Sequence, residues 1–274
     1  HDSEDMHPAI VLNADTKQIR AYRRGGDVIT ISGDGLKFAA RMIDDKAPAA
    51  KRLRRGAIIR VQTDAKNNWR ITQMPEVEAA FLSADPQNGS IRSLIGGFDF
   101  NRNKFNHVTQ AWRQPGSSFK PFIYSAALEK GFTPASIVQD DPISFPASVT
   151  GSRAWEPKNY DGKYEGAMRL RTALAKSKNM VSIRLLQASG VQFIQDYATR
   201  FGFDADKHPA YLTMALGAGS VTPWQMVAGY SVFANGGYRI QPYIVRDIRD
   251  ANGSILAESK PVTAGDQSLL VIDP

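Results

Sequence analysis

A serine and a lysine stand three residues apart in this chain, at Ser117 and Lys120. On a helix this spacing places two side chains on one face, about one turn apart, so a hydroxyl and an amine can meet there. A serine hydroxyl is a weak nucleophile at its own pKa, and a neutral amine beside it can take its proton. Desolvation or nearby positive charge lowers the pKa of a lysine for that purpose. The pair therefore predicts a serine nucleophile with a lysine as its base.

A second polar group, Ser177-Lys178-Asn179, follows later in the chain. Its hydroxyl and carboxamide are the kinds of group that hold a lysine or a substrate. Ser and Asn also favour turns between helices on their own, and a serine before a helix is often only its N-cap. Ser118 is a competing hydroxyl, but no lysine follows it at the same spacing. The residues alone leave structural and catalytic roles open.

The helix that must carry Ser117 and Lys120 can be placed from the proline and glycine residues around it. Pro115-Gly116 breaks the chain just before Ser117, and Gly131 ends the apolar run that follows. Pro121 is tolerated only near the start of a helix, because an interior proline loses a hydrogen bond. Ser117 is therefore expected at or beside the helix N-terminus, where the helix dipole favours developing negative charge.

Further elements follow from periodicity. Helices are expected over 170–176 and 180–187, on either side of the Ser177 group, and over 191–201 and 224–234. In the last of these, Trp224 and Tyr230 stand at helical spacing and are expected in the core. Short β-branched runs predict strands at 9–12, 18–22, 28–32, 58–63 and 69–72, then a hairpin of 77–84 and 90–95 around Asn88-Gly89, and extended chain at 244–248 and 255–256.

Longer stretches around both groups resemble the transpeptidase region of class A (bifunctional) penicillin-binding proteins. The stretches that carry this resemblance are 113–122, 155–162, 172–179, 216–223 and 233–237. The resemblance is strong from Pro75 to Tyr243. Residues 9–74 resemble, more weakly, the small OB-type domain inserted in some Gram-negative members. We therefore expect an α+β protein with an OB-like β-barrel domain at 1–74, frayed at its N-terminus, and a partial transpeptidase domain at 75–274, with an antiparallel sheet and a helical subdomain.

The resemblance implies a peptidoglycan DD-transpeptidase that attacks the D-Ala-D-Ala end of a stem peptide and passes the acyl group to a neighbouring amine. It also implies that β-lactams acylate the same serine. Ser117 would be the nucleophile and Lys120 its base, although the base is disputed in this superfamily. Ser177 would relay a proton to the leaving amine, and Asn179 would hold Lys120 and the substrate carbonyl.

Trp155, Asn159 and Tyr160 lie in one of the resembling stretches and are expected to border the substrate groove, with a buried aromatic cluster as the alternative. The third family motif, a Lys-Thr/Ser-Gly strand, does not occur in the sequence. That strand would help to bind the substrate carboxylate, and the second oxyanion donor follows it. The chain as written is therefore expected to be a catalytically incomplete piece of a longer protein.

Composition sets outer bounds. The 274 residues include no cysteine, and the four histidines show no metal-ligand spacing, so neither a metal nor a cofactor is expected. No apolar run reaches the roughly 20 residues that cross a bilayer. The resemblance places the parent protein at the periplasmic face of the inner membrane, anchored by an N-terminal helix absent here, with a glycosyltransferase domain before this piece.

Three alternatives remain open. A D,D-carboxypeptidase or serine β-lactamase of the same fold would use water as the acceptor. A β-lactam sensor or scaffold would keep its acyl group without turnover. The net charge of +7 and the predicted barrel also fit a nucleic-acid binder, but only Tyr22, Phe38 and Trp69 offer stacking platforms, so no nucleic acid is expected. Expected partners are stem peptides, β-lactams and an outer-membrane or cell-wall regulatory protein at the OB-like domain.

Overall fold

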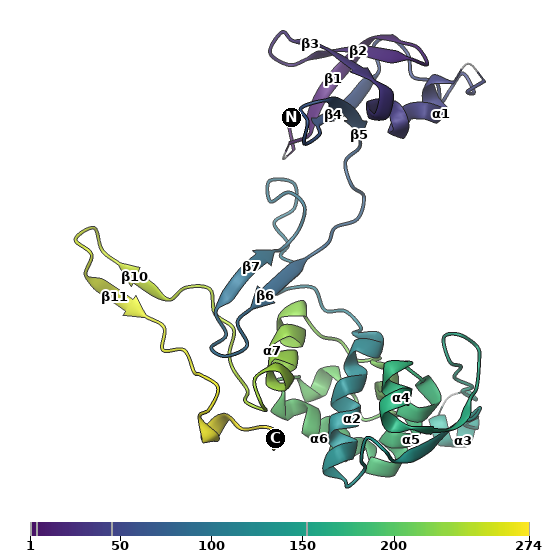
Figure 1. The fold of residues 1–274 in the computed structure, drawn as a ribbon, viewed down its shortest axis with the longest axis vertical. Helices are drawn as coiled ribbons and strands as arrows, with labels where there is room; N and C mark the ends of the chain where they lie inside the picture. The colour runs from purple at the N-terminus through teal and green to yellow at the C-terminus, as the bar shows by residue number, and fades with distance from the viewer. Residues whose placement is uncertain (1, 4, 45, 152, 274) are drawn as a thin grey trace. The chain divides into compact units, whose positions relative to one another are not determined.

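The computed structural model describes residues 2–3, 5–44, 46–151 and 153–273 (Figure 1). The chain divides into two compact units. The first takes residues up to 79 together with 97–104. The second takes 80–96 and everything from 105 onward. Each unit buries a hydrophobic cluster of its own.

The first unit is built on one antiparallel sheet of five strands, in the order β3-β2-β1-β4-β5. Alternate side chains point to the core, as in a strand with one face covered, and Val11, Ile19, Ile31 and Val61 are fully buried. All five strands predicted from the sequence are confirmed. Their bounds are β1 His7–Ala14, β2 Gln18–Arg23, β3 Val28–Ser32, β4 Ile58–Thr63 and β5 Trp69–Thr72.

A short helical segment follows β3 and was not expected. It consists of η1 (Gly33–Ala39) and α1 (Ala40–Ile43), and it buries Leu36 and Ile43 against the sheet. Gly35 lies so close to β5 that a Cβ atom there would stand 2.3 Å from the carbonyl oxygen of Trp69. The segment after one edge strand thus packs on the other edge strand, and glycine is required for that approach.

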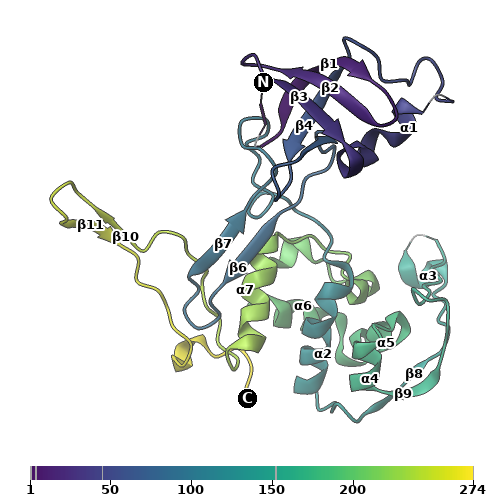
Figure 2. The same ribbon diagram turned by 45° about the horizontal axis from the view of Figure 1, so that its top comes forward.

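The second unit begins with a hairpin, β6 (Phe81–Ala84) and β7 (Ile91–Ile95), around a turn that ends at Gly89. The predicted hairpin is confirmed, although its first strand starts at Phe81 rather than Val77. Helix α7 (Pro223–Ala234) packs beside β6 (Figure 2). Thr222 and Gln225 form a capping box at its N-terminus, which satisfies two backbone amides.

Three helices of this unit pack against α2 (Lys120–Glu129), whose buried residues Phe122, Ile123 and Ala126 belong to the larger core. They are α4 (Leu170–Ala175), α5 (Asn179–Ser189) and α6 (Val191–Arg200), and α2 is preceded by the single turn η2 (Gly116–Phe119). These helices confirm the periodicity argument. Gly131, at φ 92°, ends the α2 segment as predicted.

Several short elements were not foreseen. The hairpin of β8 (Ile137–Asp140) and β9 (Gly166–Arg169) encloses a long connection with one turn of helix, α3 (Ala147–Thr150). The 3-10 turns η3 (Ala205–Lys207), η4 (Leu212–Leu216) and η5 (Gln267–Leu269) are also new. The extended segments near the C-terminus pair as β10 (Asp247–Arg249) and β11 (Ile255–Glu258). Within the described ranges, no helix combines the length and the apolar character needed to span a bilayer.

Candidate active site

The turn that carries Ser117 is η2, one residue before the start of α2. Gly116 adopts a left-handed φ of 56°, which turns the chain into the helix. The side chain of Ser117 is exposed, whereas Phe119 and Lys120 are buried. The predicted position of Ser117 beside the helix N-terminus is therefore confirmed. Amides at the start of a helix lack intrahelical acceptors, and in this turn the amides of Gly116 and Ser118 donate to the carbonyl oxygens of Gly217 and Pro115.

Aromatic packing fixes the turn from below. The ring of Phe119 is fully buried and stacks on His208, with centroids 4.7 Å apart and planes 11° from parallel. It also meets Phe203 edge-on and Phe122 at a tilt. Because Phe119 lies between Ser117 and Lys120, this packing restrains the backbone on which both depend.

Two further contacts hold the turn from the side. The hydroxyl of Tyr230 donates to the carbonyl oxygen of Ser118 at 2.8 Å. Gly217 (φ 68°) lies against Gly116. The amide of Gly116 donates to the carbonyl oxygen of Gly217 at 3.2 Å. Tyr230 was expected in the core, but its side chain is 40 % exposed. The prediction was wrong because helical spacing does not show which residues face a neighbouring turn.

Lys120 is the most constrained member of the site. Its side chain is only 1 % exposed, and its Nζ donates to the carbonyl oxygen of Ser177 at 2.6 Å, to Ser177 Oγ at 3.1 Å and to Asn179 Oδ1 at 2.7 Å. An ammonium has three N–H groups, and these three acceptors occupy all of them. The two polar groups that the sequence singled out therefore meet through Lys120.

Burial lowers the pKa of Lys120 from 10.5 to about 8, because the protonated amine loses its hydration. A base with this pKa is neutral in a useful fraction of molecules near neutral pH. Loss of the proton leaves two N–H donors and one lone pair, which frees one of the three directions around Nζ. Ser117 precedes Lys120 by three residues, which is about one turn of helix along the chain. Among the described residues, no hydrogen bond joins the two in this structure, as is common before substrate binds.

The Ser177 turn is strained. Ser177 has a φ of 53°, one of only two left-handed residues other than glycine in the described part of the chain. Its amide donates to Leu174 and the amide of Lys178 donates to Ala173, so the end of α4 holds the turn closed. A left-handed residue of this kind costs of order 1–3 kcal/mol and persists only where surrounding structure enforces it. Here it aims both oxygens of Ser177 at Lys120.

The other three predicted site residues are Asn159, Trp155 and Tyr160, and among these described residues only Asn159 contacts the residues around Lys120. Asn159 is 4 % exposed, and its amide is fully used inside the protein. Its Nδ2 donates to Asp140 Oδ1 and to the carbonyl of Lys163, and its Oδ1 accepts from the amides of Asn179 and Met180. Asn159 thus supports Asn179 in this structure, and its role as a substrate contact stays a prediction.

Trp155 and Tyr160 are not brought to Lys120. Trp155 stacks on Phe145 at 5.5 Å and packs against the core, close to the alternative expected for it. It also borders a pocket of about 850 Å³ whose lining includes neither Ser117 nor Lys120. Tyr160 is fully exposed. Both remain predictions as substrate contacts.

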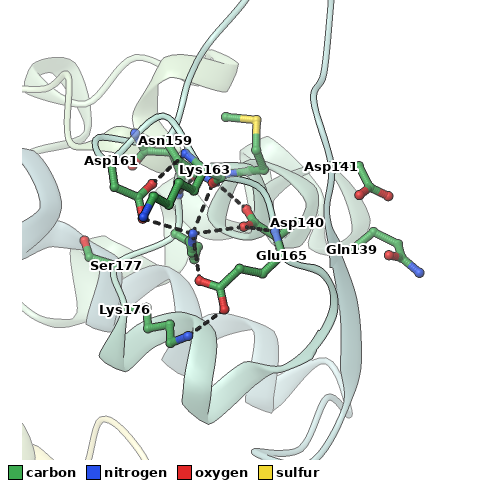
Figure 3. Close-up of polar contacts among 12 residues, drawn as sticks. Gln139, Asp140, Asp141, Asn159, Asp161, Lys163, Glu165, Lys176 and Ser177 are labelled. Carbon is green, nitrogen blue, oxygen red and sulfur yellow. Dashed lines mark hydrogen bonds and ion pairs between the residues drawn. The ribbon is translucent and has the colours of Figure 1, made fainter.

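A cluster of charged side chains around the buried Lys178 lies beside the site and was not predicted from the sequence. The ammonium of Lys178, 2 % exposed, lies 3.2 Å from Asp140, 3.3 Å from Asp161 and 3.0 Å from Glu165. Figure 3 shows these three carboxylates turned toward one point, with Lys176 on the outer side of Glu165. The sequence signal was the lysine between Ser177 and Asn179, but nothing in the pattern linked it to acidic residues in other segments.

The cluster is a set of ion pairs around a lysine. Within the described ranges, no group of three or more His, Asp or Glu side chains is arranged to hold a metal ion. The site places the amine of Lys120, with its lowered pKa, against the hydroxyl of Ser177 and the carboxamide of Asn179, and the hydroxyl of Ser117 is exposed in the turn before α2. That set of groups is suited to acyl transfer.

Comparison with known proteins agrees with this chemistry. Residues 79–270 match the family model described as "Penicillin binding protein transpeptidase domain", and residues 1–77 match the "Penicillin-binding protein OB-like domain". Penicillin-binding protein 1A of Neisseria flavescens is 44 % identical over 271 residues, which cover 99 % of this chain and 34 % of the relative. The chain thus spans about a third of the length of such relatives.

Solved structures give the same result. The crystal structure of penicillin-binding protein 1A from Haemophilus influenzae superposes with a TM-score of 0.87 at 38 % identity, over 96 % of this chain and 38 % of that one. PonA1 from Mycobacterium tuberculosis, solved in complex with penicillin V, superposes with a TM-score of 0.58 at 27 % identity, over 67 % of this chain and 51 % of that one. The chain belongs to the penicillin-binding protein transpeptidase family, in its class A group, with an OB-like domain before the transpeptidase domain.

Proposed function

We propose that this chain carries the acyl-transfer site of a peptidoglycan DD-transpeptidase that β-lactams inhibit. The observation that carries the proposal is the buried Nζ of Lys120, held by Ser177 and Asn179 one helical turn from Ser117. Its relatives in the comparisons are penicillin-binding proteins, which supports the same assignment.

In the proposed reaction, Lys120 takes the proton of Ser117 as Oγ bonds to the carbonyl carbon of the penultimate D-Ala. The bond to the terminal D-Ala then breaks, and the proton reaches the leaving amine through the hydroxyl of Ser177. An amine of a neighbouring stem attacks the acyl-enzyme and loses a proton to Lys120, and Lys120 returns that proton to Ser117 Oγ as the bond between Oγ and the acyl carbon breaks. A β-lactam undergoes the first step only, because its ring opens and its amine stays tethered.

The test uses the chain extended through a Lys-Thr/Ser-Gly segment, a pentapeptide ending in D-Ala-D-Ala, and a D-amino acid as the amine acceptor. We expect mass spectrometry to show mainly the exchange product that contains the acceptor. Ser117→Ala abolishes it, while Ser118→Ala, the matched control, keeps it. Mainly hydrolysed tetrapeptide would indicate a carboxypeptidase instead. A stable penicilloyl adduct with neither product would indicate a sensor.

We propose in addition that a regulatory protein of the outer membrane or cell wall binds the OB-like domain. Support comes from a row of paired, exposed apolar side chains across four strands, whose order is Val28, Tyr22, Ile10 and Ile58. Their exposed fractions lie between 41 % and 75 %. Arg20, on the same face of β2, suits an acidic partner rim.

A photo-crosslinking residue at position 58 tests this in growing cells, with position 16, in the exposed turn after β1, as the control. We expect one envelope protein crosslinked from 58 and none from 16. Equal crosslinking from both positions, or none from either, contradicts the proposal.

The proposed transpeptidase function places the active site on the periplasmic side of the inner membrane, where peptidoglycan stem peptides are found. Protease accessibility in spheroplasts measures that placement.

A further inference from the structure

Lys178 takes no part in the proton transfers proposed above. Its side chain is nevertheless only 2 % exposed, whereas that of Lys176 is 49 % exposed. Four acceptors surround the ammonium of Lys178, namely the carboxylates of Asp140, Asp161 and Glu165 and the carbonyl oxygen of Lys163, which lies at 3.1 Å. Asp140 is fully buried, whereas Asp161 and Glu165 are 50 % and 38 % exposed. We call this set the Lys178 cage.

The Lys178 cage ties separate segments to the catalytic turn. Asp140 ends β8, while Asp161, Lys163 and Glu165 come from the loop before β9. Asn159 links the same loop to α5, because it donates to Asp140 and accepts from the amide of Asn179 at 2.8 Å. The side chain of Asn179 donates in turn to the carbonyl of Lys158.

Lys178 is the residue between the two that hold Lys120. Its fixed side chain restrains the backbone on both sides, including the left-handed Ser177. One step further, Ser177 and Asn179 supply all three acceptors of Lys120 Nζ. A shift of the Lys178 backbone therefore moves every group that contacts the catalytic amine.

We propose that Lys178 is a positioning residue: its caged ammonium holds Ser177 and Asn179 in the geometry that keeps Lys120 enclosed and ready to accept a proton. This inference rests on the proposed function, because it assigns Lys178 a part in the same reaction. Lys178 acts through its neighbours and touches neither substrate nor the reacting atoms.

The electrostatics of the cage support a permanently charged lysine. Burial alone lowers the pKa of Lys178, but the hydrogen bonds that its ammonium donates to Glu165, Asp140 and Asp161 outweigh burial and raise the pKa overall. Lys176 and then Lys178 lower the pKa of Glu165. Tyr124 also faces Asp140, and burial raises its pKa to about 12, so it stays neutral. Lys178 therefore stays protonated and Glu165 stays ionised near neutral pH.

Lys176 supplies a charge-matched control. It pairs with Glu165 at 2.5 Å but is 49 % exposed. With three carboxylates and two lysines, the cluster has a net charge of −1, and either Lys178→Met or Lys176→Met changes it to −2. Only Lys178→Met removes the anchor of the catalytic turn. The two variants therefore separate positioning from the field of the cluster.

The experiment measures the titration of Lys120 directly, by NMR of protein labelled with ¹³Cε-lysine, without any substrate. The Lys120 signal is assigned by its loss in Lys120→Met. We expect a midpoint near 8 in the unaltered chain, a midpoint higher by about one pH unit in Lys178→Met as water reaches the amine, and no shift in Lys176→Met. Penicillin acylation of the extended chain is expected to fall about tenfold in Lys178→Met alone.

Asp161→Asn covers the case in which Lys178→Met does not fold. Asp161 is half exposed, so its loss loosens the cage without leaving a buried charge unpaired. Positioning predicts a small upward shift of the Lys120 midpoint, whereas loss of a negative charge alone predicts a downward one. Equal midpoints in the Lys178 and Lys176 variants, or a downward shift in Asp161→Asn, overturn the inference. Failure of penicillin to label Ser117 in any form would overturn the proposed function instead.

Discussion

At the scale of single residues, the site depends on one lysine that is buried yet able to lose its proton. Lys120 is 1 % exposed, and each of its neighbours is an acceptor, which favours the charged form. Desolvation acts in the opposite direction and prevails, because the pKa falls to about 8. A pKa lowered to this extent suits the amine to the role of base in the proposed reaction.

The pH dependence of acylation follows from that balance. Below pH 8 the neutral fraction of Lys120 rises about tenfold for each pH unit, and above pH 8 it levels off. The rate constant for acylation by a fluorescent penicillin should therefore rise toward a plateau with a midpoint near 8. Stopped-flow measurements between pH 6 and pH 10 check this. A rate that is flat across the range, or still rising toward 10.5, would show that the amine is not desolvated as described.

The candidate site residues Ser117, Lys120, Ser177 and Asn179 could be identified from the sequence, because their spacing and the surrounding stretches indicated them. Their supports could not. Tyr230, His208 and the Lys178 cage contact the site from segments distant in sequence, and no local pattern records a tertiary ion pair. Asn159 is an example, since the resemblance marked it as a site residue, but its hydrogen bonds to Asp140 and Asn179 could not be read from the sequence.

At the scale of elements, the site forms where the N-terminal turn of α2 meets the turn between α4 and α5. The helical periodicity of all three was visible in the sequence, and so were the boundaries of the α2 segment, set by Pro115-Gly116 and Gly131. The β8–β9 hairpin was missed because each strand has only four residues and lacks a clear alternation. That hairpin matters, because it carries Asp140 to the cage.

The contact between Gly217 and Gly116 gives a prediction at this scale. A Cβ atom at Gly217 would stand 2.1 Å from the carbonyl oxygen of Gly116, which is backbone and cannot rotate away. We expect Gly217→Ala to displace the Ser117 turn and to slow penicillin acylation of the extended chain at least about tenfold, since small misplacements of reacting groups are costly.

Gly236 provides the matched control. It has a similar left-handed φ of 85°, but a Cβ atom added there would meet no other atom within 4 Å. Gly236→Ala should cost about 1–2 kcal/mol of stability from backbone strain alone and leave the acylation rate unchanged. Equal rates in both variants would mean that the Gly217 contact does not position the nucleophile.

At the scale of the whole molecule, the two units have separate cores and therefore separate sources of stability. Ile31 is fully buried in the first unit, and its replacement by Ala should cost that unit about 2–5 kcal/mol. Ile58, 75 % exposed on the same sheet, is the control, and its Ala variant should stay within about 0.5 kcal/mol. Calorimetry should show the unfolding transition of the first unit shift to lower temperature only in Ile31→Ala. A change in Ser117 acylation in that variant would contradict independent cores.

The measurement that tests the central claim most directly is the position of the penicilloyl group. The extended chain is incubated with a labelled penicillin, digested, and mapped by mass spectrometry. The account predicts label on Ser117, retained in Ser118→Ala and lost in Ser117→Ala. Label on Ser118 or on any other residue, or an unchanged yield in Ser117→Ala, would contradict it.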